Sequence, residues 1–159
     1  MKQETTKRHA SEWHTTAWAF VIAFLSIGVL FNQVGFLKNT SPSLPYRYFI
    51  WCPHLKPRPG EITTFVHPQY GRLIKRLVGV EDNVIAYDEN GTLYVAGQRI
   101  GEPLAFDLQG KPMKSVSPGV IPKGYVFCAG YHPESLDSRY PVIGLIREEA
   151  LQGRLWGIK

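Results

Sequence analysis

Two hydroxyl side chains in the segment 39–45 (NTSPSLP) have types and a spacing that could do chemistry. Ser41 and Ser43 lie two positions apart, and residues at that spacing in an extended segment point to the same side. One hydroxyl could then act as a nucleophile while the other donates a hydrogen bond to an oxyanion. A linker rich in proline and serine has the same composition. This segment alone is therefore compatible with a catalytic pair of hydroxyls and with a simple linker.

A second group is the pair of cations in the segment 73–79 (LIKRLVG). If this segment is a strand, Lys75 shares one face with two leucines, and Arg76 lies on the other face. A lysine buried among apolar side chains loses the stabilisation of its charge, and its pKa falls from about 10.4 by up to several units. A neutral amine near pH 7–8 is a usable general base. An edge strand with both cations in water fits the spacing equally well.

The third group is the polar segment 130–140 (GYHPESLDSRY), which follows an apolar run. Asp137 and Arg139 are spaced to form an ion pair, and Ser135 and Ser138 flank the aspartate. An ordinary solvated loop has a similar composition. The groups therefore need a fold that brings them together.

The elements that must position these groups are short strands. Residues 38–159 are punctuated by proline and glycine, and Asn90-Gly91 is a strong signal for a hairpin turn. A mostly β domain, a barrel or a sandwich, is predicted. Its strands are expected at 46–52, 61–66, 73–80, 84–87, 93–95, 98–100, 125–129 and 154–158. Residues 146–151 resemble a helical turn, and 102–118 are expected to form a loop or a lid.

The N-terminal part indicates a membrane anchor. No Asp, Glu, Lys or Arg occurs between Trp13 and Leu37, and the span 17–37 would reach roughly 30 Å as a helix, the thickness of the hydrocarbon core. No small-x-small cleavage site follows it, which favours an uncleaved anchor over a signal peptide. The organisation predicted is a cytoplasmic tail at 1–16, an anchor at 17–37 and an external β domain at 38–159. The flanking charges are nearly balanced, so this orientation depends on the larger part lying C-terminal to the span.

Composition excludes several other classes. The 159 residues carry a net charge of +5, but no dense run of basic residues indicates a nucleic-acid partner. Two cysteines are too few for a disulfide scaffold or a structural zinc site, and neither a metal nor a cofactor is expected. Cys52 and Cys128 both end apolar strands. A disulfide between them in an oxidising compartment and two free buried thiols are both compatible with the sequence.

Together the three groups resemble the type I signal peptidases. The shared order is an N-terminal anchor, Ser-x-Ser-x-Pro, a strand with Lys-Arg before Gly, and Ser135-Leu136-Asp137-Ser138-Arg139-Tyr140. The resemblance runs from about residue 17 to residue 158. It implies a membrane-bound serine protease with a Ser/Lys dyad on a signal-peptidase-type β fold, anchored in the bacterial inner membrane with its catalytic domain in the periplasm.

Carried over to this sequence, the resemblance implies a role for each matching residue. Ser43 would be the nucleophile and Lys75 the general base. The Ser43 N–H and the Ser41 hydroxyl would form the oxyanion hole, and Ser135 would orient the Lys75 amine. Asp137 and Arg139 would form a structural pair, and Arg76 would face away from the site.

Departures from the common pattern point to one branch of the family. The nucleophile is followed by Leu44-Pro45, and the last motif opens with Gly130-Tyr131-His132. These features and the short chain resemble the branch that matures conjugative pilins by cleavage and in some cases by cyclisation (TraF-like). Expected partners are a pilin or leader-bearing precursor, the lipid bilayer and components of a conjugation or type IV secretion complex.

Other functions remain compatible with the sequence. The chain could be a general signal peptidase that removes leader peptides, or a non-catalytic anchored scaffold, although retention of both Ser43 and Lys75 argues against the scaffold. A Ser-His-Asp triad through His67 or His132 can also be drawn, but an exposed or structural role suits both histidines better.

Overall fold

The computed structural model describes residues 18–22, 28, 34–107 and 109–159. Two compact units divide the chain, Met1–Gly35 and Phe36–Lys159. In the first unit, residues 18–22 and 28 are helical. Among the residues described, no helix combines the length and the apolar character that a membrane span requires. Most of the anchor predicted at 17–37 lies outside the described residues, so the anchor stays a prediction.

The C-terminal end of that predicted anchor needs a correction. Strand β1 spans Gly35–Lys38, so residues 35–37 are extended rather than helical. Its first three residues are uncharged, and only Asn32 and Gln33 interrupt the apolar composition before it. Leu37 packs beside a buried cluster of the β domain, and this tertiary contact favours a strand where the composition suggested a helix.

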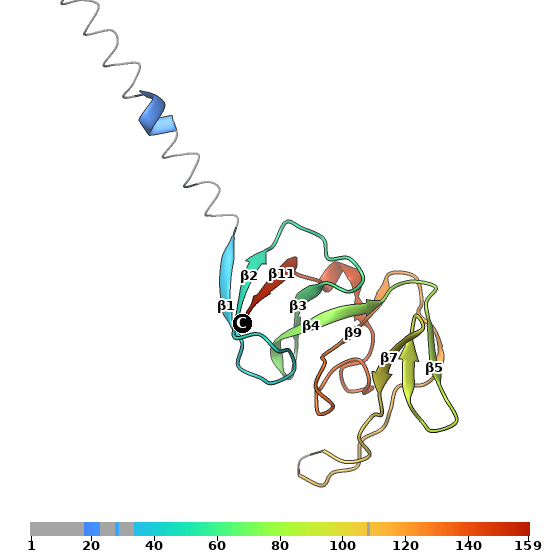
Figure 1. The fold of residues 1–159 in the computed structure, drawn as a ribbon. Coiled ribbons are helices and arrows are strands. Elements are labelled where there is room, and N and C mark those ends of the chain that lie inside the picture. The colour runs from blue at the N-terminus through green and yellow to red at the C-terminus, as the bar shows by residue number, and fades with distance from the viewer. Residues whose placement is uncertain (1–17, 23–27, 29–33, 108) are drawn as a thin grey trace, which may run out of the picture. The chain divides into compact units, whose positions relative to one another are not determined.

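Two antiparallel sheets form the domain (Figure 1). The larger has seven strands in the order β1-β2-β11-β3-β4-β9-β10, and the smaller has four in the order β7-β6-β5-β8. Beyond β1, the elements are β2 (Tyr48–Cys52), β3 (Ile62–His67), β4 (Gly71–Gly79), β5 (Val84–Tyr87), β6 (Leu93–Val95), β7 (Gln98–Gly101), β8 (Gly119–Val120), β9 (Tyr125–Ala129), β10 (Ile146–Arg147), the 3₁₀ turn η1 (Glu148–Ala150) and β11 (Arg154–Ile158).

The prediction of a mostly β fold is confirmed. The expected strands at 84–87, 93–95, 125–129 and 154–158 have the bounds predicted, and Asn90-Gly91 lies in the turn between β5 and β6. The helical turn expected at 146–151 is instead a two-residue strand followed by the 3₁₀ turn. The segment 102–118 is irregular where described, with one bridge between Phe106 and Pro112.

Strand β4 links the parts of the domain that matter for the candidate site. It pairs with β3 from Gly71 to Arg76 and with β9 from Arg76 to Gly79, with an irregular register before Gly79. At Gly79 the strand passes close to the small sheet: an added Cβ would lie 2.6 Å from Val95 and 2.7 Å from Ile121. Glycine is therefore required at this position for the two sheets to pack.

Candidate active site

Strand β4 places Lys75 in the interior of the domain. Lys75 shares its face with Leu73 and Leu77, as alternation along a strand requires, and Leu77 belongs to a buried cluster that includes Phe65 and Cys128. Only 3% of Lys75 is exposed. The sequence was compatible with a buried Lys75 and with an edge strand whose two cations lie in water. In the structure Lys75 is buried, and Arg76 is half-buried on the opposite face.

The Lys75 amine lies between two serine hydroxyls. Its Nζ atom is 2.9 Å from Ser43 Oγ and 2.9 Å from Ser135 Oγ. Ser43 and Ser135 are themselves buried, with 7% and 2% of their surfaces exposed. Residues that are 32 and 60 positions away from Lys75 in sequence are thus brought to one amine.

The segment between β1 and β2 presents Ser43 together with Ser41. The Ser41 hydroxyl donates to Ser43 Oγ at 3.1 Å, and Leu44 is buried among apolar side chains of β2, β3 and β11. Asn39 holds the turn: its amide donates to the carbonyls of Leu44 and Tyr46, and its Oδ1 accepts from the Ser41 N–H. Sequence analysis missed this function of Asn39, although asparagine commonly bonds nearby backbone in turns.

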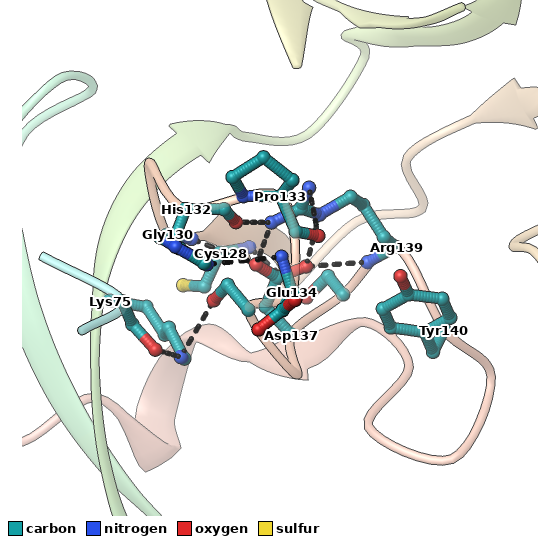
Figure 2. Close-up of polar contacts among 12 residues, drawn as sticks. Lys75, Cys128, Gly130, His132, Pro133, Glu134, Asp137, Arg139 and Tyr140 are labelled. Atoms are coloured by element: carbon teal, nitrogen blue, oxygen red, sulfur yellow. Dashed lines mark hydrogen bonds and ion pairs between the residues drawn. The ribbon is translucent and has the colours of Figure 1, made fainter. Parts of the chain in front are cut away.

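The loop after β9 is braced by a buried ion pair. Arg139 donates to both carboxylate oxygens of Asp137, from Nε at 2.9 Å and from Nη2 at 2.8 Å. Its guanidinium also donates to the carbonyls of His132 and Pro133. Both partners are almost fully buried, with 0% of Asp137 and 1% of Arg139 exposed. Figure 2 shows Lys75 extending towards the loop that this pair holds.

Gly130 joins this loop to the segment that carries Ser43. Its N–H donates to Asp137 Oδ2 at 2.8 Å, and the next N–H, of Tyr131, donates to the Ser43 carbonyl at 2.8 Å. A Cβ at Gly130 would collide with the Ser135 hydroxyl and lie 2.8 Å from the Ser43 carbonyl. The close approach of the two segments therefore requires glycine here. This requirement was not visible in the sequence.

Burial controls the proton affinity of the Lys75 amine. Loss of solvent contact lowers the pKa of Lys75 from 10.5 to about 8, opposed by the Asp137 carboxylate and assisted by the Arg139 guanidinium. About half of this amine is then neutral at pH 8, whereas an ordinary lysine amine would be almost fully protonated at that pH. A neutral amine 2.9 Å from a hydroxyl can accept its proton, and the hydroxyl becomes a competent nucleophile.

Comparison with known proteins identifies the family. A model of the signal peptidases of peptidase family S26 matches residues 10–157. The chain belongs to this signal peptidase family. Its members are serine peptidases that act on precursor proteins and are typically membrane-associated. This match identifies the family but does not distinguish its branches. The conjugative pilin maturation branch therefore stays a prediction from the sequence.

One solved structure of a signal peptidase is similar to this chain. A signal peptidase I from Enterococcus faecalis V583 is 27% identical, with a TM-score of 0.46, and the match covers 64% of this chain and 97% of that chain. No curated protein sequence matches the chain significantly.

The imidazoles of the two histidines considered for a Ser-His-Asp triad make other contacts, although the His132 backbone N–H lies 3.4 Å from the Ser43 carbonyl. His132 Nδ1 accepts from the Glu134 N–H, and His67 Nδ1 accepts from the Gln69 N–H. Within the part of the chain that the structure describes, Ser43 Oγ contacts Lys75 and Ser41 rather than a histidine. The geometry therefore favours a lysine over a histidine as the partner of Ser43.

The disulfide considered between Cys52 and Cys128 is not present, and both thiols are free. Cys52 ends β2 and Cys128 lies in β9, with β11, β3 and β4 between them in the sheet. Strands are about 4.8 Å apart, so four steps along the sheet exceed the roughly 7 Å limit between the Cα atoms of a disulfide. Burial raises the pKa of the Cys128 thiol, which keeps it protonated and unreactive.

Two residues at the edge of the site were not assigned a role in catalysis from the sequence. The Arg76 guanidinium lies over the Tyr131 ring, 4.7 Å from its centroid, and donates to Gln98 at 3.1 Å. Tyr131 is the residue whose N–H bonds the Ser43 carbonyl. Arg76, on the face opposite Lys75 as expected, thus supports the same loop from the other side of β4.

Proposed function

We propose that this chain is a membrane-anchored serine endopeptidase in which Ser43 and Lys75 form the catalytic dyad. The observation that carries the proposal is the 2.9 Å contact between Lys75 Nζ and Ser43 Oγ in a buried site. Ser–Lys arrangements are a known variant of the serine-protease logic and are recognised by geometry. Membership of the signal peptidase family supports the same chemistry.

The reaction begins with attack of Ser43 Oγ on the carbonyl carbon of the peptide bond that is cut. The hydroxyl proton passes to the neutral Lys75 amine, and a tetrahedral oxyanion forms. When the C–N bond breaks, Lys75 returns the proton to the leaving amine. An ester between Ser43 and the substrate remains, and it is attacked either by water, giving hydrolysis, or by the substrate's own amino terminus, giving a cyclic product.

The oxyanion would be held by the Ser43 N–H and the Ser41 hydroxyl. The Ser41 hydroxyl lies 3.1 Å from Ser43 Oγ, so a small rotation directs it to an oxygen on the attacked carbon. Donors that are fixed before the reaction stabilise the charge that develops in the transition state. The bonds from Asn39 to the surrounding backbone keep this segment in place.

Ser135, Asp137 and Arg139 are positioning residues in this proposal. The Ser135 hydroxyl lies 2.9 Å from the Lys75 amine and orients it. Asp137 and Arg139 hold the loop that presents Ser135, through the ion pair and the bond to the Gly130 N–H. The hydrogen bonds of the Asp137 and Arg139 side chains go to each other and to the backbone of this loop, so these two residues have no direct part in bond making.

The proposed substrate is an exported precursor, with a conjugative pilin as the first candidate. The sequence supports this choice through Ser43-Leu44-Pro45 and Gly130-Tyr131-His132, which depart from the common signal peptidase motifs. The uncharged stretch before β1 supports an anchor in the bacterial inner membrane. The larger size of the part after it favours the periplasmic side for the catalytic domain. A general signal peptidase acting on leader peptides has the same dyad.

The pH dependence of cleavage should report the Lys75 amine. Since the base must be neutral and its pKa is lowered to about 8, we expect kcat/KM to rise about tenfold per pH unit below that value and to level off above it. The measurement is kcat/KM between pH 5.5 and 10 on a peptide without titrating side chains. An inflection near 6.5 would indicate a histidine base, and one near 10.5 a solvated lysine.

Cleavage of a pilin precursor in membranes tests the function. Wild type and Ser43→Ala are compared by mass spectrometry of the products, with His132→Ala as the control for a histidine base. We expect wild type and His132→Ala to process the precursor and Ser43→Ala to leave it intact. A product lighter by one water than the linear fragment identifies cyclisation.

The other outcomes separate the alternatives. Processing of leader-bearing precursors without processing of the pilin would assign general signal peptidase activity. Assembly of a conjugation complex supported fully by Ser43→Ala would indicate a scaffold and overturn the proposed catalysis.

A further inference from the structure

A groove opens beside the loop that carries Ser135, and the mechanism above does not use it. It lies between the irregular segment after β7 and the segment 134–142, and its volume is about 560 Å³, within the range of roughly 300–1,000 Å³ typical of ligand sites. Most of its lining side chains are apolar, and two acidic and two basic side chains accompany them. The apolar members are Tyr70, Leu104, Pro112, Met113, Leu136, Tyr140, Pro141 and Val142, and the charged ones are Asp107, Lys111, Lys114 and Glu134.

The groove lies beside the loop that supports the proposed dyad, although Ser43, Lys75 and Ser135 are not among its lining residues. Glu134 and Leu136 both line it, and the residue between them, Ser135, accepts a hydrogen bond from Lys75. Consecutive Cα atoms are about 3.8 Å apart, so the groove begins within one residue of the hydroxyl that touches the catalytic amine.

The direction of the reaction selects which part of a substrate reaches this groove. Lys75 must give a proton to the leaving amine, so that nitrogen lies next to Lys75 Nζ. Ser41, the proposed oxyanion donor, contacts Ser43 Oγ, whereas Ser135 contacts Lys75 Nζ. A chain that continues from the leaving nitrogen on the Lys75 side would run towards Ser135 and the groove residues next to it in sequence.

The walls of the groove are tied to the buried loop. The Leu104 N–H donates to the Tyr140 hydroxyl at 3.1 Å, and the Val116 N–H donates to the Arg139 carbonyl at 2.8 Å. The Tyr87 hydroxyl in turn donates to the Val116 carbonyl at 2.8 Å. These bonds hold the outer wall against residues 139 and 140, so the groove is formed before a substrate arrives, which lowers the cost of binding.

We propose that this groove binds the substrate segment C-terminal to the cleaved bond, as an extended polypeptide with at least one apolar side chain. The proposal rests on the proposed dyad, because the dyad defines which side of the substrate leaves. The groove would hold the departing segment during acylation. After that segment has left, an incoming amino terminus could occupy the same place, next to the Lys75 amine.

Peptides of different length after the cleaved bond test the groove. Two internally quenched peptides share alanines one and three residues before the bond; the short one has a single residue after it, and the long one has six with apolar side chains. We expect wild type in its full-length form, in detergent micelles, to cleave the long peptide with kcat/KM at least about tenfold higher, the gain expected when one apolar side chain is buried.

Two matched variants locate the effect. Val142 lines the groove and is 44% exposed, while Val120 lies on β8, outside the groove, and is 60% exposed. We expect Val142→Asp to bring the ratio of kcat/KM for the long peptide to kcat/KM for the short peptide close to 1. We expect Val120→Asp to keep the wild-type ratio. A wild-type ratio near 1, or an unchanged ratio in Val142→Asp, would overturn the proposal that the groove binds this part of the substrate.

A binding measurement separates this proposal from the dyad. A fluorescein-labelled hexapeptide with the sequence after the cleaved bond is titrated into Ser43→Ala, with and without Val142→Asp or Val120→Asp, and followed by anisotropy. Saturable binding that Val142→Asp weakens about tenfold or more supports the groove even if no peptide is cut. Absent binding, or equal binding in both variants, contradicts the proposal that the groove binds substrate, whether or not Ser43 and Lys75 form the catalytic dyad.

Discussion

Lys75→Ala is expected to lower kcat/KM for precursor cleavage by about 10³-fold or more. Among the residues that the structure describes, the only other side chain that hydrogen-bonds Ser43 Oγ is the Ser41 hydroxyl, which is a very weak base. The leaving amine also loses its proton donor. The measurement is the initial rate of cleavage in detergent micelles, with Lys75→Met as a second variant that fills the same space with an uncharged side chain.

The control for this experiment is Lys123→Ala, which removes an exposed lysine from the turn before β9 and should keep the wild-type rate. Ser41→Ala gives a graded comparison, since loss of one oxyanion donor typically costs about 10²–10³ in rate. Lys75→Met should keep the wild-type melting temperature or exceed it, because it removes a buried amine and fills the same space. Lys75→Ala leaves a cavity at a residue that is only 3% exposed and should lower the melting temperature. More than a tenth of wild-type activity in folded Lys75→Met would refute the lysine as the base.

Arg139→Met is expected to destabilise the fold by about 3–5 kcal/mol, the usual result of removing one partner of a buried ion pair. Asp137 would remain as a carboxylate with none of its surface exposed. The Pro133 carbonyl would lose the donor from Arg139, and the His132 carbonyl would keep only the Ser135 N–H. The measurement is urea unfolding of the full-length protein in micelles, followed by tryptophan fluorescence.

A second ion pair offers the matched control. Arg99 and Glu102 approach to 3.8 Å with 63% and 66% of their side chains exposed, and exposed pairs of this kind contribute about 0–1 kcal/mol. Arg99→Met should therefore change the unfolding free energy by no more than that. Combining Asp137→Asn with Arg139→Met should cost less than the sum of the two single changes, since no unpaired charge remains. If the changes in unfolding free energy were strictly additive, Asp137 and Arg139 would not stabilise the fold through their mutual interaction.

The positions of the strands could be predicted from the sequence more completely than the arrangement of the residues in the candidate site. Turn signals such as Asn90-Gly91 and Ala96-Gly97 separate runs of β-branched and aromatic residues, and these signals give β5 and β6 their bounds. Strand β1 was missed because its apolar residues continue the uncharged run before it, and β10 because two residues carry no periodicity.

Side-chain types alone could not decide the burial of Lys75. Alternation places Lys75 and Arg76 on opposite faces, but which face is covered depends on the loop after β9, whose residues have no repeating pattern. The resemblance to signal peptidases indicated Ser43, Ser135, Asp137 and Arg139, and the structure brings these residues near Lys75. Asn39 bonds backbone only two to seven residues away, a contact that its type suggests but does not specify. Gly130 is required by the approach of the distant Ser43 segment, and such a contact leaves no local trace in sequence.

The position of β11 sets the order in which the domain can assemble during synthesis. This strand follows all the others in the chain, yet it lies between β2 and β3 and pairs with both. Until residues 154–158 have been made, β2 has no partner on that side and the large sheet stays open at its centre. Contacts between residues so distant in sequence form slowly. A nascent chain would therefore carry all the residues of the dyad and its supports while still lacking the framework that aligns them, and activity would begin only after β11 has been inserted.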